Sequence, residues 1–198
     1  MTDDELQALL DAACYGAGQS CDLRATNLLN PLIPIDPAQP GTPGAPAATV
    51  TIADVARFLP ATATLRAEPD GWAVIGVPAN FWVESTPITV SGELLGNTAQ
   101  VRFTPRAYRF DYGDGSTRAT STAGGSWASL GQEELTETRT SHVYRSRADR
   151  RAAVTVVYSA EYRFADGPWI TVAGAVSGTT PPQRVLVVVE RTALTTPA

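Results

Sequence analysis

Apolar and polar residues alternate with period two over much of the chain after residue 49. Tyr108, Phe110 and Tyr112 alternate with polar neighbours, and the longest run of this kind covers residues 152–164. Because successive side chains of a strand point to opposite faces, the pattern predicts strands with one face in a core. Further strands are predicted at 49–52, 62–67, 72–77, 80–83, 88–95, 99–103, 169–172 and 185–189, with single helical turns at 53–58 and 126–130. About ten short strands separated by turn signals are typical of a β-sandwich, so the chain is predicted to be all-β.

The first residues predict a short helix. Thr2 supplies a capping hydroxyl, and the acidic residues that follow it favour the positive end of a helix. Gly16 and Gly18 predict the end of the helix. A helix of this length is marginal alone, so its apolar side must dock either on the main domain or on a partner protein. That side consists of Leu6, Leu9, Leu10 and Ala13, which recur at helical spacing.

Cys14 and Cys21 are the two cysteines of the chain and lie close together. A closely spaced even pair without other metal-type ligands predicts a disulfide, and two free buried thiols are the alternative. A disulfide would place the protein outside the cytoplasm, as an extracellular or cell-surface protein. The residues before Leu6 lack the basic region and apolar run of a signal peptide. We therefore expect that a signal has been removed, and export by another route is the alternative.

Six prolines recur at every third position from Pro31 to Pro46. Polyproline II has three residues per turn, so this spacing aligns the rings along one edge of an extended rod. The stretch is predicted to be a semi-rigid spacer, and a ligand for an aromatic groove in a partner is the alternative. The predicted organisation is a short helix with a disulfide loop (1–29), a Pro-rich linker (30–48), a β-sandwich (49–191) and a tail (192–198).

The composition narrows the classes of partner. The chain has 198 residues, of which 43% are apolar, enough for a buried core, and its net charge is −5. That charge argues against nucleic acid, because neutralising phosphates needs a basic surface. No apolar run is long enough to span a membrane. All basic residues are arginines, which indicates a GC-rich genome rather than a requirement of the fold.

The most specific stretch is the aromatic strand that ends in Gly113-Asp114-Gly115 and is followed, after a loop, by His142-Val-Tyr144. The glycines permit a tight turn, and the aspartate can hydrogen-bond its own backbone. This combination resembles the PKD domain, the polycystic-kidney-disease type of immunoglobulin-like β-sandwich, of the kind found in actinobacterial cell envelopes. The resemblance covers about residues 86–190, with residues 49–85 expected to add strands. The motif residues, expected to be structural, are Tyr108, Phe110, Gly113, Asp114, Gly115, His142 and Tyr144.

Two features depart from the pattern of that family. The connection 117–139 is longer than usual, and residues 145–151 stand where the family has a glycine before the next strand. Both departures concern loop conformation. PKD-like domains are generally extracellular modules for adhesion, spacing or contact with carbohydrate or protein, and the resemblance implies such a role here.

Few residues are suited to catalysis. His142 is the single histidine and is predicted to close the strand entry by hydrogen bonds, although a Ser-His-Asp site would have to use it. A Gly-x-Ser-x-Gly motif is absent, and the ligands are too few for zinc. Asp111 and Asp114 are predicted to form the turn rather than a calcium site. A glycosidase would need two carboxylates across a cleft, from Asp111, Asp114, Glu133, Glu134 and Glu161. We therefore predict that the protein is not an enzyme and has no cofactor and no metal.

Recognition is predicted to involve tryptophans and strand edges. Trp127 lies in a loop and Trp169 follows a turn, so these two are the candidates for exposure. The alternative is that all four tryptophans lie in the core. An exposed indole offers a platform for sugar rings or a hot spot for a protein. An unpaired strand edge can accept a strand from a partner.

Three functions are consistent with these observations. The first is a non-enzymatic extracellular or cell-surface structural or binding module that contacts protein or carbohydrate. The second is a subunit of a surface assembly such as a pilus or filament, which would self-assemble. The third is an accessory module or weak hydrolase that acts on polysaccharide.

Overall fold

The computed structural model describes residues 49–60 and 63–189. Strands make up 52% of the structure and helices 6%, so the predicted all-β class is confirmed. Four predicted features lie outside the described residues: the N-terminal helix, the Cys14–Cys21 disulfide, the Pro-rich stretch 30–48 and the tail 192–198.

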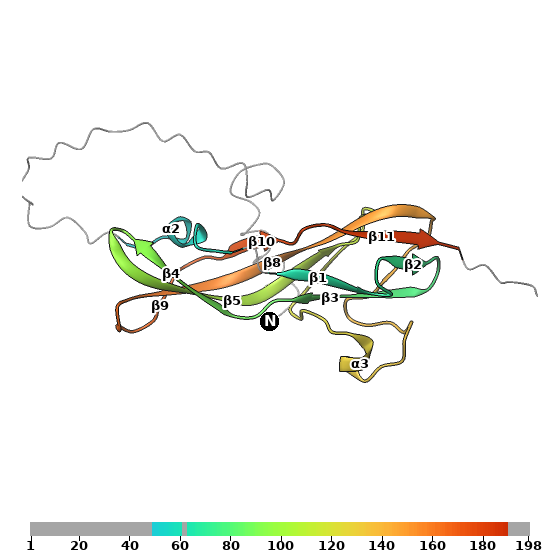
Figure 1. Cartoon of the computed structure of the whole chain (residues 1–198), viewed down its shortest axis with the longest axis horizontal. Helices are drawn as coiled ribbons and strands as arrows, with labels where there is room; N and C mark the ends of the chain where they lie inside the picture. Colours follow the sequence, from blue (N-terminus) through green and yellow to red (C-terminus); the bar gives the residue numbers. More distant parts are fainter. Residues whose placement is uncertain (1–48, 61–62, 190–198) are drawn as a thin grey trace, which may run out of the picture.

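The described residues form two helices and eleven strands (Figure 1). The helices are α2 (Ile52–Ala56) and α3 (Trp127–Leu130). The strands are β1 (Thr64–Glu68), β2 (Trp72–Val74), β3 (Pro78–Glu84), β4 (Ile88–Leu94), β5 (Asn97–Asp111), β6 (Thr117–Thr120), β7 (His142–Val143), β8 (Ala148–Phe164), β9 (Ile170–Thr171), β10 (Val176–Thr179) and β11 (Gln183–Val188).

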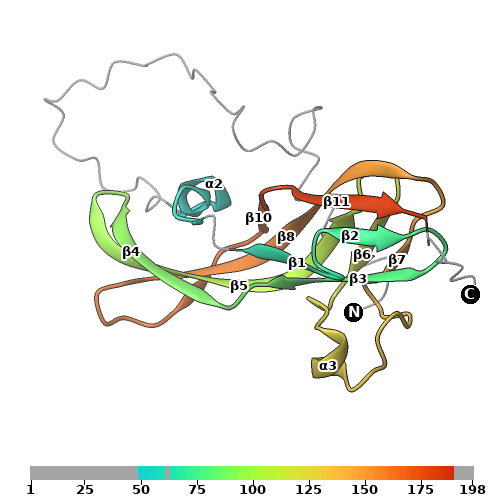
Figure 2. The same cartoon turned by 45° about the vertical axis from the view of Figure 1, so that its right-hand side comes forward.

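Most strands belong to one large sheet built on the antiparallel pair β5 and β8, which run along an elongated molecule (Figure 1). The main strand order is β2-β11-β8-β5-β4, with β6 on β5, and with β9 and β10 on β8. Its β2 and β11 run parallel, and its other pairs are antiparallel. A smaller sheet, β1-β3-β7, lies over part of the large one, on the side where α3 projects (Figure 2).

One apolar core joins the two sheets. Phe81 of β3 belongs to the smaller sheet, and its ring centroid lies 5.3 Å from that of Tyr112, at the end of β5. Tilted aromatic contacts of this kind stabilise a core beyond the burial of area alone. The predicted alternation is confirmed along both long strands, since Tyr108, Phe110, Val154 and Val156 are buried while Arg109 and Asp111 are exposed.

β5 is one strand where the sequence predicts two. The predicted strand 99–103 continues into the aromatic strand through Pro105 and Arg106. The register shifts at this point: Pro105 lies opposite Tyr158, whereas Ala107 lies opposite Val157, which leaves Arg106 as the extra residue of a bulge. The bulge accommodates a proline that cannot donate to the ladder, so the strand is not interrupted.

Residues 49–52, predicted as a strand, lead instead into α2. Thr51 is the N-cap: its hydroxyl accepts a hydrogen bond from the Asp54 backbone N–H (3.4 Å), and its own N–H donates to the Asp54 carboxylate (2.8 Å). This reciprocal capping box satisfies two backbone donors at the helix start. The helix buries Val55 completely, in agreement with the helical turn predicted in this region.

The Gly113–Gly115 turn passes very close to β8. Both glycines have positive φ, +77° and +90°. A Cβ at Gly113 would lie 2.5 Å from the carbonyl oxygen of Arg151, whereas nothing lies within 4 Å of a Cβ at Gly115. Gly113 is therefore required both by its backbone conformation and by its contact with β8.

Gly113→Ala is expected to lower the free energy of unfolding by about 3 kcal/mol, because backbone strain and overlap with β8 add. Gly115→Ala is the matched control, with strain alone, and is expected to cost about 1 kcal/mol. Urea unfolding followed by tryptophan fluorescence compares the two variants. Equal stability of both would show that β8 does not constrain Gly113.

Candidate functional site

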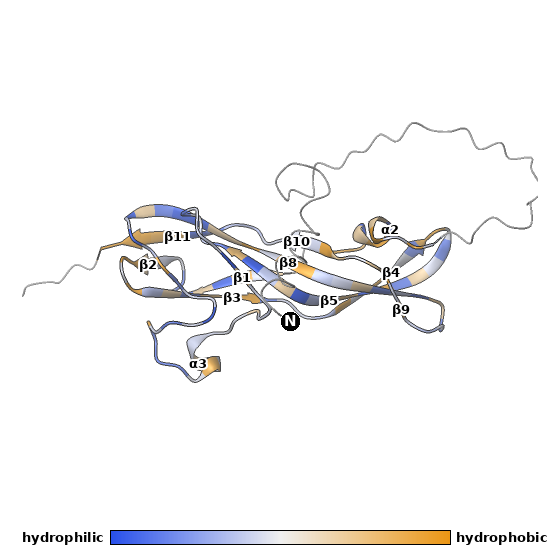
Figure 3. Ribbon diagram, turned by 180° about the vertical axis from the view of Figure 1, so that it is seen from behind, coloured by the Kyte–Doolittle hydropathy of each residue, from blue (hydrophilic) through white to orange (hydrophobic). Residues whose placement is uncertain are grey.

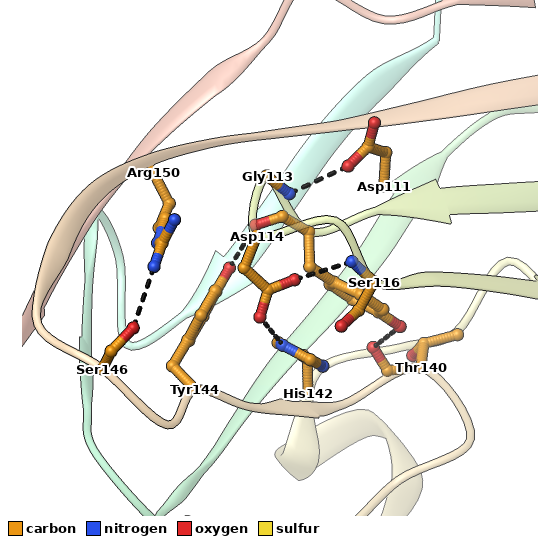
Figure 4. A network of polar contacts seen from close by, with 10 residues as sticks. Asp111, Gly113, Asp114, Ser116, Thr140, His142, Tyr144, Ser146 and Arg150 are labelled. Atoms are coloured by element: carbon orange, nitrogen blue, oxygen red, sulfur yellow. Dashed lines mark hydrogen bonds and ion pairs between the residues drawn. The ribbon is translucent and has the colours of Figure 1, made fainter.

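The two sequence motifs meet in a polar and aromatic corner (Figure 4). Asp114, from the glycine turn, and His142, from β7, lie 2.7 Å apart between Oδ2 and Nε2. Their side chains are 17% and 14% exposed. The contact joins the start of β7 to the turn after β5, which is the kind of role predicted for His142.

Two tyrosines pack against the His142 ring. The imidazole stacks on Tyr112, with centroids 4.3 Å apart and planes 8° from parallel, and meets Tyr144 edge-on at 4.7 Å. The Tyr144 hydroxyl donates to the Tyr112 carbonyl (2.9 Å), and the Tyr112 hydroxyl donates to the Thr140 carbonyl (3.1 Å). Burial raises the pKa of Tyr112 to about 12 and also raises the pKa of Tyr144, so both hydroxyls remain donors at neutral pH.

The carboxylates of the turn stabilise the turn itself. Asp111 accepts a hydrogen bond from Gly113 N–H (2.9 Å), and Asp114 accepts one from Ser116 N–H (2.9 Å). These contacts support the turn-forming role predicted for both aspartates. Partial burial raises the pKa of Asp114, but hydrogen bonds from His142 and Ser116 outweigh it, so the pKa lies below its ordinary value.

The order of groups in this corner differs from that of a catalytic triad. In a Ser-His-Asp site the imidazole lies between hydroxyl and carboxylate and takes the proton of the hydroxyl. In this corner the Asp114 carboxylate is the central group. It accepts hydrogen bonds from Ser116 on one side and contacts His142 on the other. Among the described residues, no group of three or more histidine, cysteine, aspartate or glutamate side chains is arranged to hold a metal ion.

Trp127 is only 3% exposed, so its predicted exposure is wrong. Its indole Nε1 donates to the Thr136 carbonyl (3.0 Å), and its backbone N–H donates to the Glu68 carboxylate (2.9 Å). Ser126 caps α3, and Gly131, with φ +65°, ends it, so the loop turns back and covers the indole. Trp127 anchors the loop and offers no platform to a ligand.

Asn80 fastens the same loop to β3. Its side chain is fully buried: Nδ2 donates to the Gly125 carbonyl (2.8 Å), and Oδ1 accepts from the Thr138 hydroxyl (2.8 Å). These partners stand 45 and 58 positions away in the sequence. A buried amide that is satisfied in this way fixes both ends of the loop.

Trp169, the second predicted binding residue, is partly exposed and stands directly before β9. The guanidinium carbons of Arg102 and Arg163 lie 4.4 and 4.7 Å from its ring centroid. Arg102 donates two hydrogen bonds to Glu161 (3.0 and 2.8 Å), and Arg163 donates one to Gln100 (2.8 Å). We call these five residues the Trp169 cluster.

The cluster lies on the outer face of β5 and β8. Arg102 stands between the buried residues Val101 and Phe103, so its side chain points away from the core. Glu161 neutralises Arg102, whereas the partner of Arg163 is a neutral amide. Within the described residues Arg163 forms no ion pair, so its charge is available to a ligand. The sequence signal that could have found these residues is the set of polar positions alternating with the core positions.

Trp72, which the sequence analysis did not single out, is 45% exposed. The sequence predicts a strand at 72–77. Only residues 72–74 form β2, which lies at the edge of the large sheet beside β11. β2 is therefore shorter than the predicted strand, and Trp72, its first residue, directly follows the turn that ends at Gly71.

Compared with models of known protein families, with characterised proteins and with solved structures, the chain shows no match. No helix within residues 49–60 and 63–189 has both the length and the apolar character needed to cross a bilayer.

Asp114→Asn is expected to cost about 1–3 kcal/mol of stability at neutral pH, because it removes charge-assisted hydrogen bonds. The pKa of Asp114 is lowered by folding, so the contribution of the carboxylate is complete above its ordinary pKa of 3.8 and is lost as the pH falls through the lower folded value. Unfolding free energies of wild type and variant, measured by urea from neutral to acid pH, should therefore converge in acid.

A double-mutant cycle of Asp114→Asn with His142→Gln tests the contact itself. Residues in direct contact couple, and we expect a coupling free energy of about 1 kcal/mol at neutral pH. Strictly additive effects would contradict an energetically significant contact between the two motifs.

Proposed function

We propose that this chain is a non-catalytic extracellular or cell-surface binding module, built on a PKD-like β-sandwich, that contacts carbohydrate through the Trp169 cluster. The observation that carries the proposal is a partly exposed indole held by two arginines on an outer sheet face. Placement outside the cytoplasm rests on the predicted Cys14–Cys21 disulfide.

The contact between Asp114 and His142 supports the PKD-like scaffold. It brings together the two motifs on which the resemblance rests, the glycine turn and His-x-Tyr. It also supports recognition over catalysis, because the single histidine is largely buried among Tyr112, Tyr144 and Asp114. A general base needs hydrogen-bond access to a substrate proton, and these neighbours restrict that access.

The surroundings of Trp169 favour a carbohydrate over a protein. The part of the indole that the two guanidinium groups leave exposed supplies an apolar surface. The neighbouring guanidinium, amide and carboxylate groups supply donors and acceptors for hydroxyl groups. A protein hot spot instead centres on a desolvated pocket. The contacts of Trp169 with Arg102 and Arg163 are polar and lie on an outer face, which suits a hydroxylated ligand better.

Trp169→Ala is expected to weaken binding to polysaccharide at least about tenfold, which is the effect of losing an aromatic hot spot. Depletion of the full chain from solution by cellulose, chitin, peptidoglycan and arabinogalactan measures the binding. Trp72→Ala is the matched control, since Trp72 is also exposed but belongs to β2, and it should bind like the wild type.

Two outcomes would overturn parts of the proposal. Undiminished binding by Trp169→Ala would remove the Trp169 cluster as the site, and capture of an envelope protein without binding to any polysaccharide would replace carbohydrate by protein. Cleavage of a polysaccharide that is lost in His142→Gln would show that the module is catalytic.

A further inference from the structure

An apolar strip lies exposed on the outer face of β2 and β11, at the edge of the large sheet. β2 runs parallel to β11, with Trp72 opposite Leu186 and Val74 opposite Val188. Trp72 is 45% and Leu186 40% exposed, and Val74 and Val188 are partly exposed. The C-terminal part of β11 is correspondingly apolar in Figure 3. We call these four residues the apolar strip.

The strip is flanked by basic residues. Asp149 lies opposite Leu186 on the neighbouring strand β8 and is paired with Arg184 at 2.8 Å. Asp149 is the one acidic residue of the segment 145–151, so this ion pair with Arg184 leaves the arginines of the segment without an acidic residue of their own segment. The segment has three further exposed arginines, Arg145, Arg147 and Arg151, and Arg151 lies opposite Arg184 of β11. An apolar surface bordered by such charge is suited to an acidic amphipathic partner.

The chain itself contains a segment with that chemistry. Residues 2–15 carry Asp3, Asp4, Glu5 and Asp11 and no basic residue. The same residues place Leu6, Leu9, Leu10 and Ala13 at helical spacing, and a helix this short needs a surface to dock on. The apolar side matches the strip, and Asp3 and Glu5 border that side.

We propose that residues 2–15 dock as an amphipathic helix on the apolar strip of the same chain, with Asp3 and Glu5, which border the apolar side of that helix, toward the arginines of 145–151. The connection from residue 16 to residue 48 is long enough, since the proline-spaced part alone extends about 3.1 Å per residue. A tethered segment reaches an effective concentration of order millimolar, which favours docking within the chain over capture of a partner.

Hydrogen exchange of the full chain, read by mass spectrometry, tests this docking. Amides of residues 5–13 should be protected in the wild type and should exchange at least about tenfold faster in the double variant Trp72→Ala/Leu186→Ser, which removes the exposed anchors. Leu6→Asp/Leu10→Asp should release the segment in the same way. Trp169→Ala, outside the strip, should leave the protection unchanged.

Each remaining outcome overturns the proposal. Exchange of residues 5–13 in the wild type at the rate of an unfolded peptide would show that nothing docks. Protection that persists in the strip variant would place the segment elsewhere. Protection that rises with protein concentration would show docking between chains, in line with a self-assembling subunit.

Discussion

The antiparallel pairing of β5 with β8 is the interaction on which the rest of the sheet depends. β4 and β6 pair with β5, while β9, β10 and β11 pair with β8, so each of them is positioned by one member of this pair. With 15 and 17 residues, the two strands remain paired on both sides of the bulge at Arg106. Since one face of both strands lies in the core, the residues between the core positions point to the other face, where Arg109 and Asp111 are exposed and Arg102 and Glu161 are partly exposed.

This geometry separates the two exposed surfaces. The Trp169 cluster uses Glu161 and Arg163 near the C-terminal end of β8, whereas the apolar strip lies beside Asp149 near its N-terminal end. At the rise of a strand, the distance along β8 between Arg151 and Arg163 is about 40 Å. A segment docked on the strip would therefore leave the Trp169 cluster free, so the proposed docking at one end and the proposed recognition at the other would not compete.

Features that depend on neighbouring residues could be predicted from the sequence, and features that depend on distant ones could not. The alternation around Phe110 and the helical turn at α3 are local, and both are present. The burial of Trp127 depends on Glu68, 59 positions away, which no periodicity encodes. The exposure of Trp72 depends on where β2 lies in the sheet, at the edge beside β11, and an apolar run by itself does not encode strand order. The helix start at Thr51 could have been predicted from neighbouring residues, because the spacing of Thr51 and Asp54 is that of a capping box. The prediction of a strand at 49–52 followed instead from the alternating residues there.

A polar atom that is engaged in a structural hydrogen bond is less available for acid–base catalysis. The Asp114 carboxylate uses Oδ1 for Ser116 and Oδ2 for His142, so the groups best suited to acid–base chemistry are engaged in closing the fold. Trp169 is also held in place, by Arg102 and Arg163, but on an exposed face. A ring that is already fixed loses little conformational entropy when a ligand binds. Rigidity would thus have opposite consequences at the two places: enclosed atoms have less access to a substrate, whereas a fixed ring that faces solvent would bind the proposed ligand at a smaller entropic cost.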